Sequence, residues 1–274
     1  MVATKTRISS PVRLPAVAGS FYPSDANELR ALVLELLDKA QSPALDNVRG
    51  LIAPHAGYQY SGLVAAHSFR TLRGLSQGVY TVYLMGPAHY VPVYGVGLSS
   101  ARAFETPLGR VPVAQDRVEK LLALGGPYHL ADSAHLPEHS LEVELPFLQV
   151  TLPQAQIVPM LFDSAADYTR VGEDLARILA EDPRSLLVVS SDLSHYHTYD
   201  EAVRLDRSFL HAVITGDLSQ ASGGEACGLP AILTAMTVAE ILGWRAHLLA
   251  YRNSGDSGGP IWEVVGYGSV AYTG

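Results

Sequence analysis

Residues 50–58 read Gly-Leu-Ile-Ala-Pro-His-Ala-Gly-Tyr, and this stretch sets a pattern that the rest of the chain repeats. A short apolar run is typical of a strand buried on both faces, and proline cannot donate a ladder hydrogen bond, so a strand is expected to stop at Pro54. His55 follows at once, and residues 81–89 and 185–195 show the same order of apolar run and histidine. The chain therefore places a histidine shortly after each of three predicted strands.

The segments between these runs have helical spacing of their apolar residues. Strands that alternate with helices predict an α/β fold with a central, mostly parallel or mixed sheet flanked by helices. No linker-like stretch divides the chain, so residues 1–274 are predicted to form a single domain, with residues 1–23 as an irregular lead-in. Residues 138–150 are predicted to form one helix, although Pro146 lies inside it and an interior proline kinks or splits a helix.

The composition argues against several classes of protein. Apolar residues make up 48% of the chain and charged residues 17%, which is typical of a well-packed globular protein and not of a disordered one. The net charge of −8 gives no support to nucleic-acid binding. We expect neither a signal peptide nor a membrane span, because the sequence shows no such apolar pattern. The chain has one cysteine, so we expect a cytoplasmic protein without internal disulfides.

The ends of the predicted strands are the expected place for a functional site, because open α/β sheets bind ligands beyond the carboxyl ends of their strands. Imidazole is the commonest metal ligand in proteins, and two histidines with one anionic ligand leave positions open for a substrate. The candidate histidines are His55, His89 and His195. The anionic ligand could come from Cys227, Glu225 or Asp192, and the spacing does not choose among them.

Each of these residues also has an ordinary structural interpretation. A single histidine at a strand end is more often a hydrogen-bonded loop residue than a ligand, and a lone cysteine more often fills a core or caps a helix. In favour of a ligand role, Cys227 comes just before a predicted helix, and a helix N-terminus lowers the pKa of a thiol. His139 and Glu142 lie one turn apart on the helix predicted over 138–150, and we interpret them as part of a solvated face.

Longer motifs point to a known family. Residues 54–62, Pro-His-Ala-Gly-Tyr-Gln-Tyr-Ser-Gly, resemble the signature of the Memo family. Further segments resemble that family in the same order from about residue 13 to the end of the chain. They are residues 18–23 (Ala-Gly-Ser-Phe-Tyr-Pro), 86–89 (Gly-Pro-Ala-His), 106–109 (Thr-Pro-Leu-Gly), 138–142 (Glu-His-Ser-Leu-Glu), 190–196 (Ser-Ser-Asp-Leu-Ser-His-Tyr), 226–228 (Ala-Cys-Gly), 253–256 (Asn-Ser-Gly-Asp) and 265–267 (Val-Gly-Tyr).

The resemblance implies a fold similar to that of the class III extradiol dioxygenases, which hold Fe(II) with two histidines and a glutamate. It implies that His55 and His89 are metal ligands and that Cys227 takes the place of the glutamate. The resemblance implies Fe(II) as the metal, and because a thiolate is softer than a carboxylate, Cu or Zn would also fit. The resemblance further implies an acid–base role for His195 with Asp192 beside it.

The same resemblance suggests a substrate pocket and partners. His139 and Tyr58 are expected to line a pocket for a small-molecule substrate. Bacterial members of the family are grouped with radical-SAM proteins, so a partner protein of that kind is expected. The predicted function is that of a metal-dependent oxidoreductase. A binding or adaptor protein that keeps the pocket without chemistry, and a zinc-dependent hydrolase, are the alternatives.

One short motif suggests a different chemistry. Residues 255–260, Gly-Asp-Ser-Gly-Gly-Pro, match the nucleophile motif of chymotrypsin-like proteases, and residues 65–68 resemble their histidine motif. Those enzymes are secreted, disulfide-bonded all-β proteins, whereas this chain has one cysteine and alternates strands with helices. His67 also lies in a helical pattern. We therefore interpret the motif as a glycine-rich loop near the site.

Overall fold

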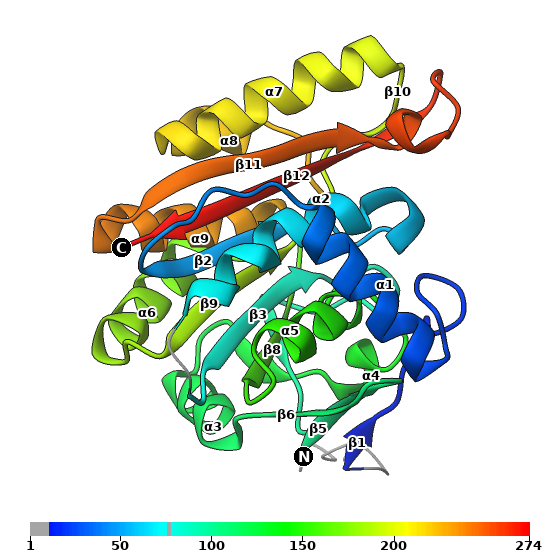
Figure 1. Cartoon of the computed structure of the whole chain (residues 1–274). Helices are drawn as coiled ribbons and strands as arrows, with labels where there is room; N and C mark the ends of the chain where they lie inside the picture. Colours follow the sequence, from blue (N-terminus) through cyan, green and yellow to red (C-terminus); the bar gives the residue numbers. More distant parts are fainter. Residues whose placement is uncertain (1–10, 76–77) are drawn as a thin grey trace.

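A computed structural model describes residues 11–75 and 78–274, so the first ten residues of the predicted lead-in lie outside the described residues. Within the described part the strands form one large sheet and one small one (Figure 1). The large sheet contains β2 (Val48–Ala53), β3 (Thr81–Pro87), β4 (Val96–Leu98), β7 (Tyr128–Leu130), β8 (Gln156–Phe162), β9 (Ser185–Ser190), β10 (His195–His197), β11 (Arg245–Asn253) and β12 (Val264–Thr273). The small one contains β1 (Val12–Arg13), β5 (Ala103–Thr106) and β6 (Gly109–Pro112).

The centre of the large sheet is parallel. Its order is β10-β12-β2-β9-β3-β8-β4-β7, with β11 paired to β12 off this path. Strands β2, β9, β3 and β8 run parallel to one another, whereas β12 and β4 are antiparallel to their neighbours β2 and β8. The predicted α/β fold with a mixed sheet is therefore confirmed. Because the four central strands are parallel, their carboxyl ends meet at one edge, and the segments after β2, β3 and β9 lie together there.

Helices cover the sheet on both faces, as Figure 1 shows. In the described residues the α-helices are α1 (Ala26–Lys39), α2 (Tyr58–Arg70), α3 (Gln115–Leu124), α4 (Asp132–His135), α5 (Leu145–Thr151), α6 (Tyr168–Glu181), α7 (Tyr199–Thr215), α8 (Leu218–Ser222) and α9 (Leu229–Leu242). Short 3₁₀ helices are η1 (Thr71–Gly74), η2 (Glu142–Glu144) and η3 (Ser254–Ser257). Helices α1, α2 and α5 pack against one another, α6 packs against α9, and α7 lies along β11 and β12.

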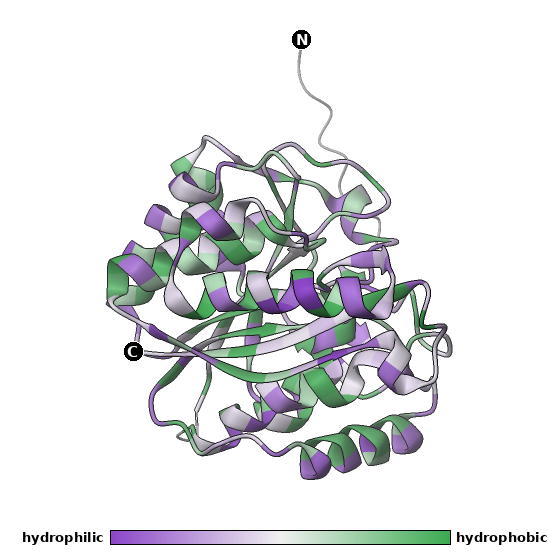
Figure 2. Cartoon of the chain, turned by 90° about the horizontal axis from the view of Figure 1, so that it is seen from above, coloured by the Kyte–Doolittle hydropathy of each residue, from purple (hydrophilic) through white to green (hydrophobic). Residues whose placement is uncertain are grey.

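Helix α1 shows how the sequence forms these covering elements. The Asp25 side chain accepts hydrogen bonds from the backbone N–H groups of Asn27 and Glu28, which satisfies donors that the first turn leaves free. Residues Leu29 and Val33, one turn apart, are fully buried, and the polar positions face outward. Figure 2 shows the same mixture of hydrophobic and hydrophilic residues along the outer helices. In contrast, every residue of β9 is buried, because both faces of that strand are covered.

The prediction of one helix over residues 138–150 was wrong. Residues 138–141 form a loop, η2 follows, and α5 begins only at Leu145. Pro146 lies in the first turn of α5, where its missing N–H has no partner to lose and its fixed φ suits the helix. The leucines do have helical spacing, but the proline marks the start of a helix and not its middle.

Residues 11–23 are largely irregular, as predicted, but they are anchored in the core. Strand β1 pairs with β5, and Arg13 is fully buried, where its guanidinium forms an ion pair with Glu142. The Glu142 carboxylate also accepts the N–H groups of Ala16 and Val17 at 2.7 and 3.0 Å. Glu142 is therefore a buried anchor, and its interpretation as part of a solvated face was wrong.

Among the described residues, no helix combines the length and the apolar character needed to cross a membrane.

Candidate metal centre

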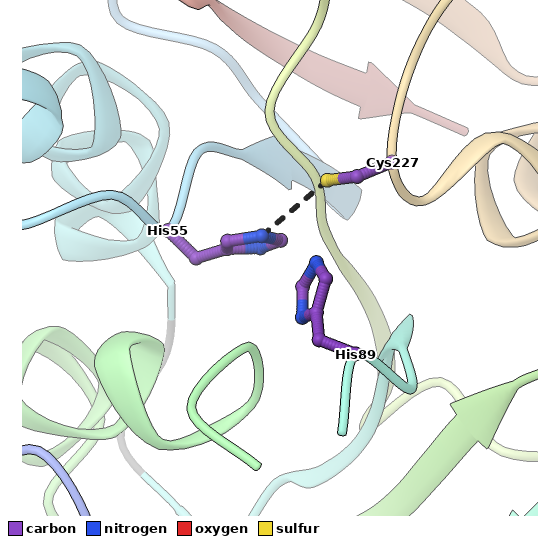
Figure 3. Close-up of side chains that lie close together, drawn as sticks. All are labelled: His55, His89 and Cys227. Atoms are coloured by element: carbon purple, nitrogen blue, oxygen red, sulfur yellow. Dashed lines mark hydrogen bonds between the residues drawn. The ribbon is translucent and has the colours of Figure 1, made fainter. Parts of the chain in front are cut away.

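Two histidines and the cysteine come together at the carboxyl edge of the parallel strands. His55 follows β2, His89 follows β3, and Cys227 lies in the loop just before α9. One potential ligand atom from each residue lies within 4.8 Å of those of the other two. Figure 3 shows the three side chains pointing toward one another from these separate segments. Two imidazoles and one sulfur in this arrangement form a cluster that could hold a single metal ion.

His55 is the most enclosed member of the cluster, with 2% of its surface exposed. Its backbone N–H donates to Asp192 Oδ1 at 2.9 Å, and its ring Nδ1 lies 2.8 Å from Ser190 Oγ. The other ring nitrogen, Nε2, lies 3.4 Å from Cys227 Sγ. Burial, together with the neighbouring His139 and His89 imidazoles, holds the pKa of His55 well below its usual value. A neutral imidazole of this kind is the form that binds a metal.

His89 has a different environment. Its side chain is 29% exposed, and its Nδ1 lies 2.9 Å from Oε1 of Glu138, a residue that is only 3% exposed. The same Glu138 carboxylate accepts the backbone N–H groups of His139 and Ser140, both at 2.9 Å. Burial by itself would raise the pKa of Glu138, but the hydrogen bonds from His139 and His89 outweigh burial and hold that pKa far below its ordinary range. Glu138 is therefore an ionised partner of the His89 ring.

The pKa of the Cys227 thiol differs from the sequence-based expectation. We expected the start of α9 to lower its pKa, but burial, followed by the nearby Asp192 carboxyl, raises the pKa of the thiol to about 12. The residue precedes α9 by two positions, and low polarity around the sulfur disfavours a thiolate more than the helix end favours it. Sγ accepts a hydrogen bond from Asp192 N at 3.2 Å. A metal bound here would have to displace the thiol proton.

The other candidates for the anionic ligand have different partners. Glu225 Oε2 lies 2.8 Å from His197 Nε2, and the Glu225 side chain is 51% exposed. Asp192 is buried, and its carboxylate accepts the backbone N–H of His55. Burial, more than any other factor, raises the pKa of Asp192. Of the three alternatives, the described residues therefore bring Cys227 into the cluster with the two histidines.

His195 lies in β10 with its ring orientation fixed by its own loop. Its Nδ1 is 2.8 Å from the Leu193 carbonyl oxygen. Because a carbonyl can only accept, Nδ1 must carry the proton, and in the neutral ring the lone pair is on Nε2. Asp192 is close enough for the charge of His195 to affect its pKa, but its Oδ1 accepts from the His55 backbone.

The two predicted pocket residues are placed differently. The His139 ring stacks on that of His89 with centroids 4.7 Å apart, and it lies 5.3 Å from the His55 ring. His139 is therefore beside the cluster. Tyr58 is in the core, where its hydroxyl donates to the Val143 carbonyl at 2.7 Å and its ring packs on Phe147. The structure does not direct the Tyr58 hydroxyl to the cluster.

The protease-like motif forms a turn whose polar groups are engaged elsewhere. Residues 254–257 are the 3₁₀ helix η3, which is capped by Asn253. Ser257 Oγ donates to the Tyr60 carbonyl at 3.2 Å. His67, in α2, has its Nδ1 3.3 Å from Ser42 Oγ. Ser257 and His67 are thus hydrogen-bonded to other residues and not to each other.

Sequence reasoning missed the residues that hold the histidine rings. Glu138 stands inside one of the quoted motifs but has no recognisable spacing to His89, which is 49 residues away. Ser190 has the appearance of an ordinary strand end, and Glu144 falls within the single helix that was wrongly predicted over 138–150. The only signal in the sequence for Glu138 and Ser190 is that each lies inside a motif that resembles the Memo family.

Comparison with known proteins identifies the family. The family model described as Memo-like protein matches residues 13–271. A MEMO1 family protein from Methanothermobacter thermautotrophicus is 34% identical over 281 residues, covering 95% of this chain and all of the relative. A MEMO1 family protein from Thermotoga sp. is 36% identical over 277 residues, covering 93% of this chain and 97% of the relative.

A solved structure shares the fold. The crystal structure of an uncharacterized protein from Escherichia coli K12 superposes with a TM-score of 0.54 at 15% identity, covering 83% of this chain and 100% of that one. At this identity the likeness concerns the fold alone. The match of the family model over nearly the whole chain, together with relatives above 30% identity along their full length, shows that this chain belongs to the Memo family.

Proposed function

We propose that this Memo-family protein binds one metal ion through His55, His89 and Cys227 and uses it in a redox reaction on a small molecule. The observation that carries the proposal is the convergence of three ligand atoms within 4.8 Å from three separate segments. Both histidines also have a hydrogen-bonding partner at Nδ1, which is typical of metal-binding histidines. The comparisons place the chain in the Memo family.

Fe(II) is the proposed metal because the family resemblance implies it, and Cu or Zn are competitors. Two imidazoles and one thiolate suit all three metals, and three protein ligands leave positions open for substrate or O₂. A bound Fe(II) would supply one-electron chemistry. Oxidation of the thiolate is a competing reaction that a carboxylate ligand would avoid. The proposed enzyme therefore needs either shielding of the sulfur or reducing surroundings, and a partly buried Cys227 is consistent with shielding.

The side of the cluster at His89 is the proposed approach for the substrate. The His89 side chain is 29% exposed, and the neighbouring Tyr90 is 55% exposed, with its ring 5.6 Å from that of His139. In this proposal His139 and Tyr90 contact the substrate. His195 accepts a proton through Nε2, which its bond to the Leu193 carbonyl leaves with the lone pair.

The test is an anaerobic Fe(II) titration of metal-free protein, with elemental analysis of protein as purified. We expect one tight site per chain, and we expect His89→Ala and Cys227→Ser to abolish it. The matched control is His197→Ala, because His197 is a nearby histidine whose ring pairs with Glu225 outside the cluster. Tight stoichiometric binding that persists in both ligand variants would show that the ligands are wrong. Absence of specific binding of iron, copper and zinc to the wild type would rule out the metal enzyme.

A further inference from the structure

Ser190, at the end of β9, lies at the centre of a buried hydrogen-bond network behind His55. In the described residues its Oγ lies 2.6 Å from the Ser140 carbonyl oxygen, 2.8 Å from Glu144 Oε1 and 2.8 Å from His55 Nδ1. Ser190 and Glu144 are fully buried. Three polar groups, two from residues 140–144 and one from His55, thus meet on one hydroxyl.

The number of protons in this network fixes the state of His55. A serine hydroxyl has one proton to donate, and the Ser140 carbonyl can only accept. If that proton went to His55, the Ser190 and Ser140 oxygens would face each other at 2.6 Å with no proton between them. The contact between His55 and Ser190 is therefore a hydrogen bond in which Nδ1 carries the proton and donates it. The lone pair of the neutral ring is consequently on Nε2, the nitrogen that lies 3.4 Å from Cys227 Sγ.

Glu144 has no evident structural reason to be a glutamate. It has no exposed surface, and its Oε2 is buried without a hydrogen-bond partner among the described residues. A buried polar atom without a partner costs free energy that an apolar side chain of similar size would not. Burial, more than the opposing hydrogen bond from Ser190, raises the pKa of Glu144 well above its usual value. Because Ser190 has one proton and the Ser140 carbonyl takes it, Glu144 can form the 2.8 Å hydrogen bond to Ser190 Oγ only as the donor, in its protonated form.

We propose that Ser190 and Glu144 are positioning residues for His55, and that together they fix its ring with the proton on Nδ1 and the Nε2 lone pair directed at the metal site. The inference rests on the proposed metal-binding function, because positioning matters only if His55 is a ligand. Neither residue is one of the three proposed metal ligands. Partners of this kind typically change metal affinity by about 10- to 100-fold when they are removed.

The first experiment needs no metal. Metal-free protein with ¹⁵N-labelled histidine is studied by long-range ¹H–¹⁵N correlation spectra, with His55→Ala used to assign the His55 signals. We expect wild-type His55 to show a protonated Nδ1 and an unprotonated Nε2, and we expect Ser190→Ala to give a mixture of tautomers. A wild-type ring protonated on Nε2, or a Ser190→Ala ring that stays entirely in the Nδ1–H form, would overturn the inference.

The second experiment compares three variants by Fe(II) titration. Ser190→Ala and Glu144→Leu are expected to bind Fe(II) about 10- to 100-fold more weakly. Glu144→Gln is expected to bind nearly as well as wild type, because its amide can donate to Ser190 Oγ as a protonated carboxyl does. Glu144→Leu should also keep the wild-type thermal midpoint, which separates positioning from a structural role. Wild-type affinity in Glu144→Leu would overturn the role of Glu144.

The two proposals fail in different ways. If wild-type protein bound no metal, the proposed function would fail, while the tautomer measurement on metal-free protein would still decide whether Ser190 fixes His55. If the wild type binds Fe(II) and both Ser190→Ala and Glu144→Leu match it, only the positioning inference fails.

Discussion

His55 and His89 both follow a parallel strand of the same sheet, yet their rings are held by different chemistry. His89 is partly exposed, and its Nδ1 faces an ionised carboxylate, Glu138, at 2.9 Å. His55 is buried, and its Nδ1 faces a hydroxyl, Ser190, with Glu144 behind it. A carboxylate partner makes an imidazole a stronger electron donor than a hydroxyl does. The two proposed ligands are thus expected to differ in basicity although they are the same residue type.

The two histidine rings are also held in place by different parts of the structure. On the His55 side, burial and the parallel pairing of β2 with β9 hold the ring. On the His89 side, a loop supplies Glu138, and that loop is in turn held by Arg13, whose guanidinium donates to the backbone carbonyls of Glu138 and His135. The position of the partly exposed His89 therefore depends on Arg13 near the N-terminus, whereas the position of the buried His55 depends on the core.

The largest expected effect comes from breaking the anchor of the His89 half. Arg13 and Glu142 are both fully buried, so Arg13→Ala leaves a carboxylate in the core without its cationic partner. We expect the free energy of unfolding to fall by about 3–5 kcal/mol. Urea unfolding measures this, with Lys39→Ala as the control, because the Lys39–Glu35 pair is exposed and is expected to contribute less than about 1 kcal/mol. A loss of unfolding free energy in Arg13→Ala as small as that in Lys39→Ala would show that the fold does not need this anchor.

A second prediction separates burial from ligand function by using a histidine outside the cluster. His135 is 1% exposed, its Nε2 lies 3.0 Å from the Gly97 carbonyl, and burial lowers its pKa from 6.5 to about 4. The unfolded chain therefore binds a proton that the folded chain excludes between these pH values. The associated stability is complete above about pH 6.5 and is lost as the pH falls to about 4, by about 3 kcal/mol.

Urea unfolding of metal-free protein at pH 7.5 and pH 4 measures this loss. In His135→Gln, whose amide can still donate to Gly97, the difference between the two pH values is expected to shrink by about 3 kcal/mol. An unchanged difference would mean that His135 is not a source of acid sensitivity, and that burial alone does not explain the lowered pKa of histidines in this core.

The next prediction concerns Glu138, the hydrogen-bonding partner of His89. Glu138→Gln keeps the size of the side chain but removes its charge, so Fe(II) affinity is expected to fall by about 10-fold or more. The Ser190→Ala variant acts on the other histidine, and because the two partners hold different ligands, their effects should add in the double variant. Anaerobic Fe(II) titration of the two single variants and the double variant checks this. A double variant no weaker than either single one would show that the two halves act as one unit.

The smallest expected effect concerns a residue that the sequence offered as a ligand. Glu225 is half exposed and pairs with His197. Glu225→Ala is expected to change the unfolding free energy by less than about 1 kcal/mol and to leave Fe(II) affinity unchanged. The measurement is the same titration beside Cys227→Ser. A loss of the iron site in Glu225→Ala would restore the carboxylate as the third ligand.

The architecture and the main candidates for the site could be predicted from local patterns in the chain. Apolar runs of strand length ending before His55 and His89 predicted the parallel strands and the edge at which they end, because local periodicity and proline positions act over a few residues. The alternation of strands and helices predicted the α/β fold. The place of Cys227 before a predicted helix made it a candidate, and only the family resemblance, not spacing, preferred it to Glu225 or Asp192.

Contacts between residues far apart in the chain account for what those patterns missed. His89 meets Glu138 across 49 positions, and His55 meets Ser190 across 135. Only the folded chain could show that Pro146 starts a helix, that Glu142 pairs with Arg13 in the core, and that the thiol of Cys227 is harder to ionise than its place before a helix suggested. The physical reason is that burial and hydrogen bonding set the pKa and orientation of a side chain, and neither is encoded in local sequence spacing.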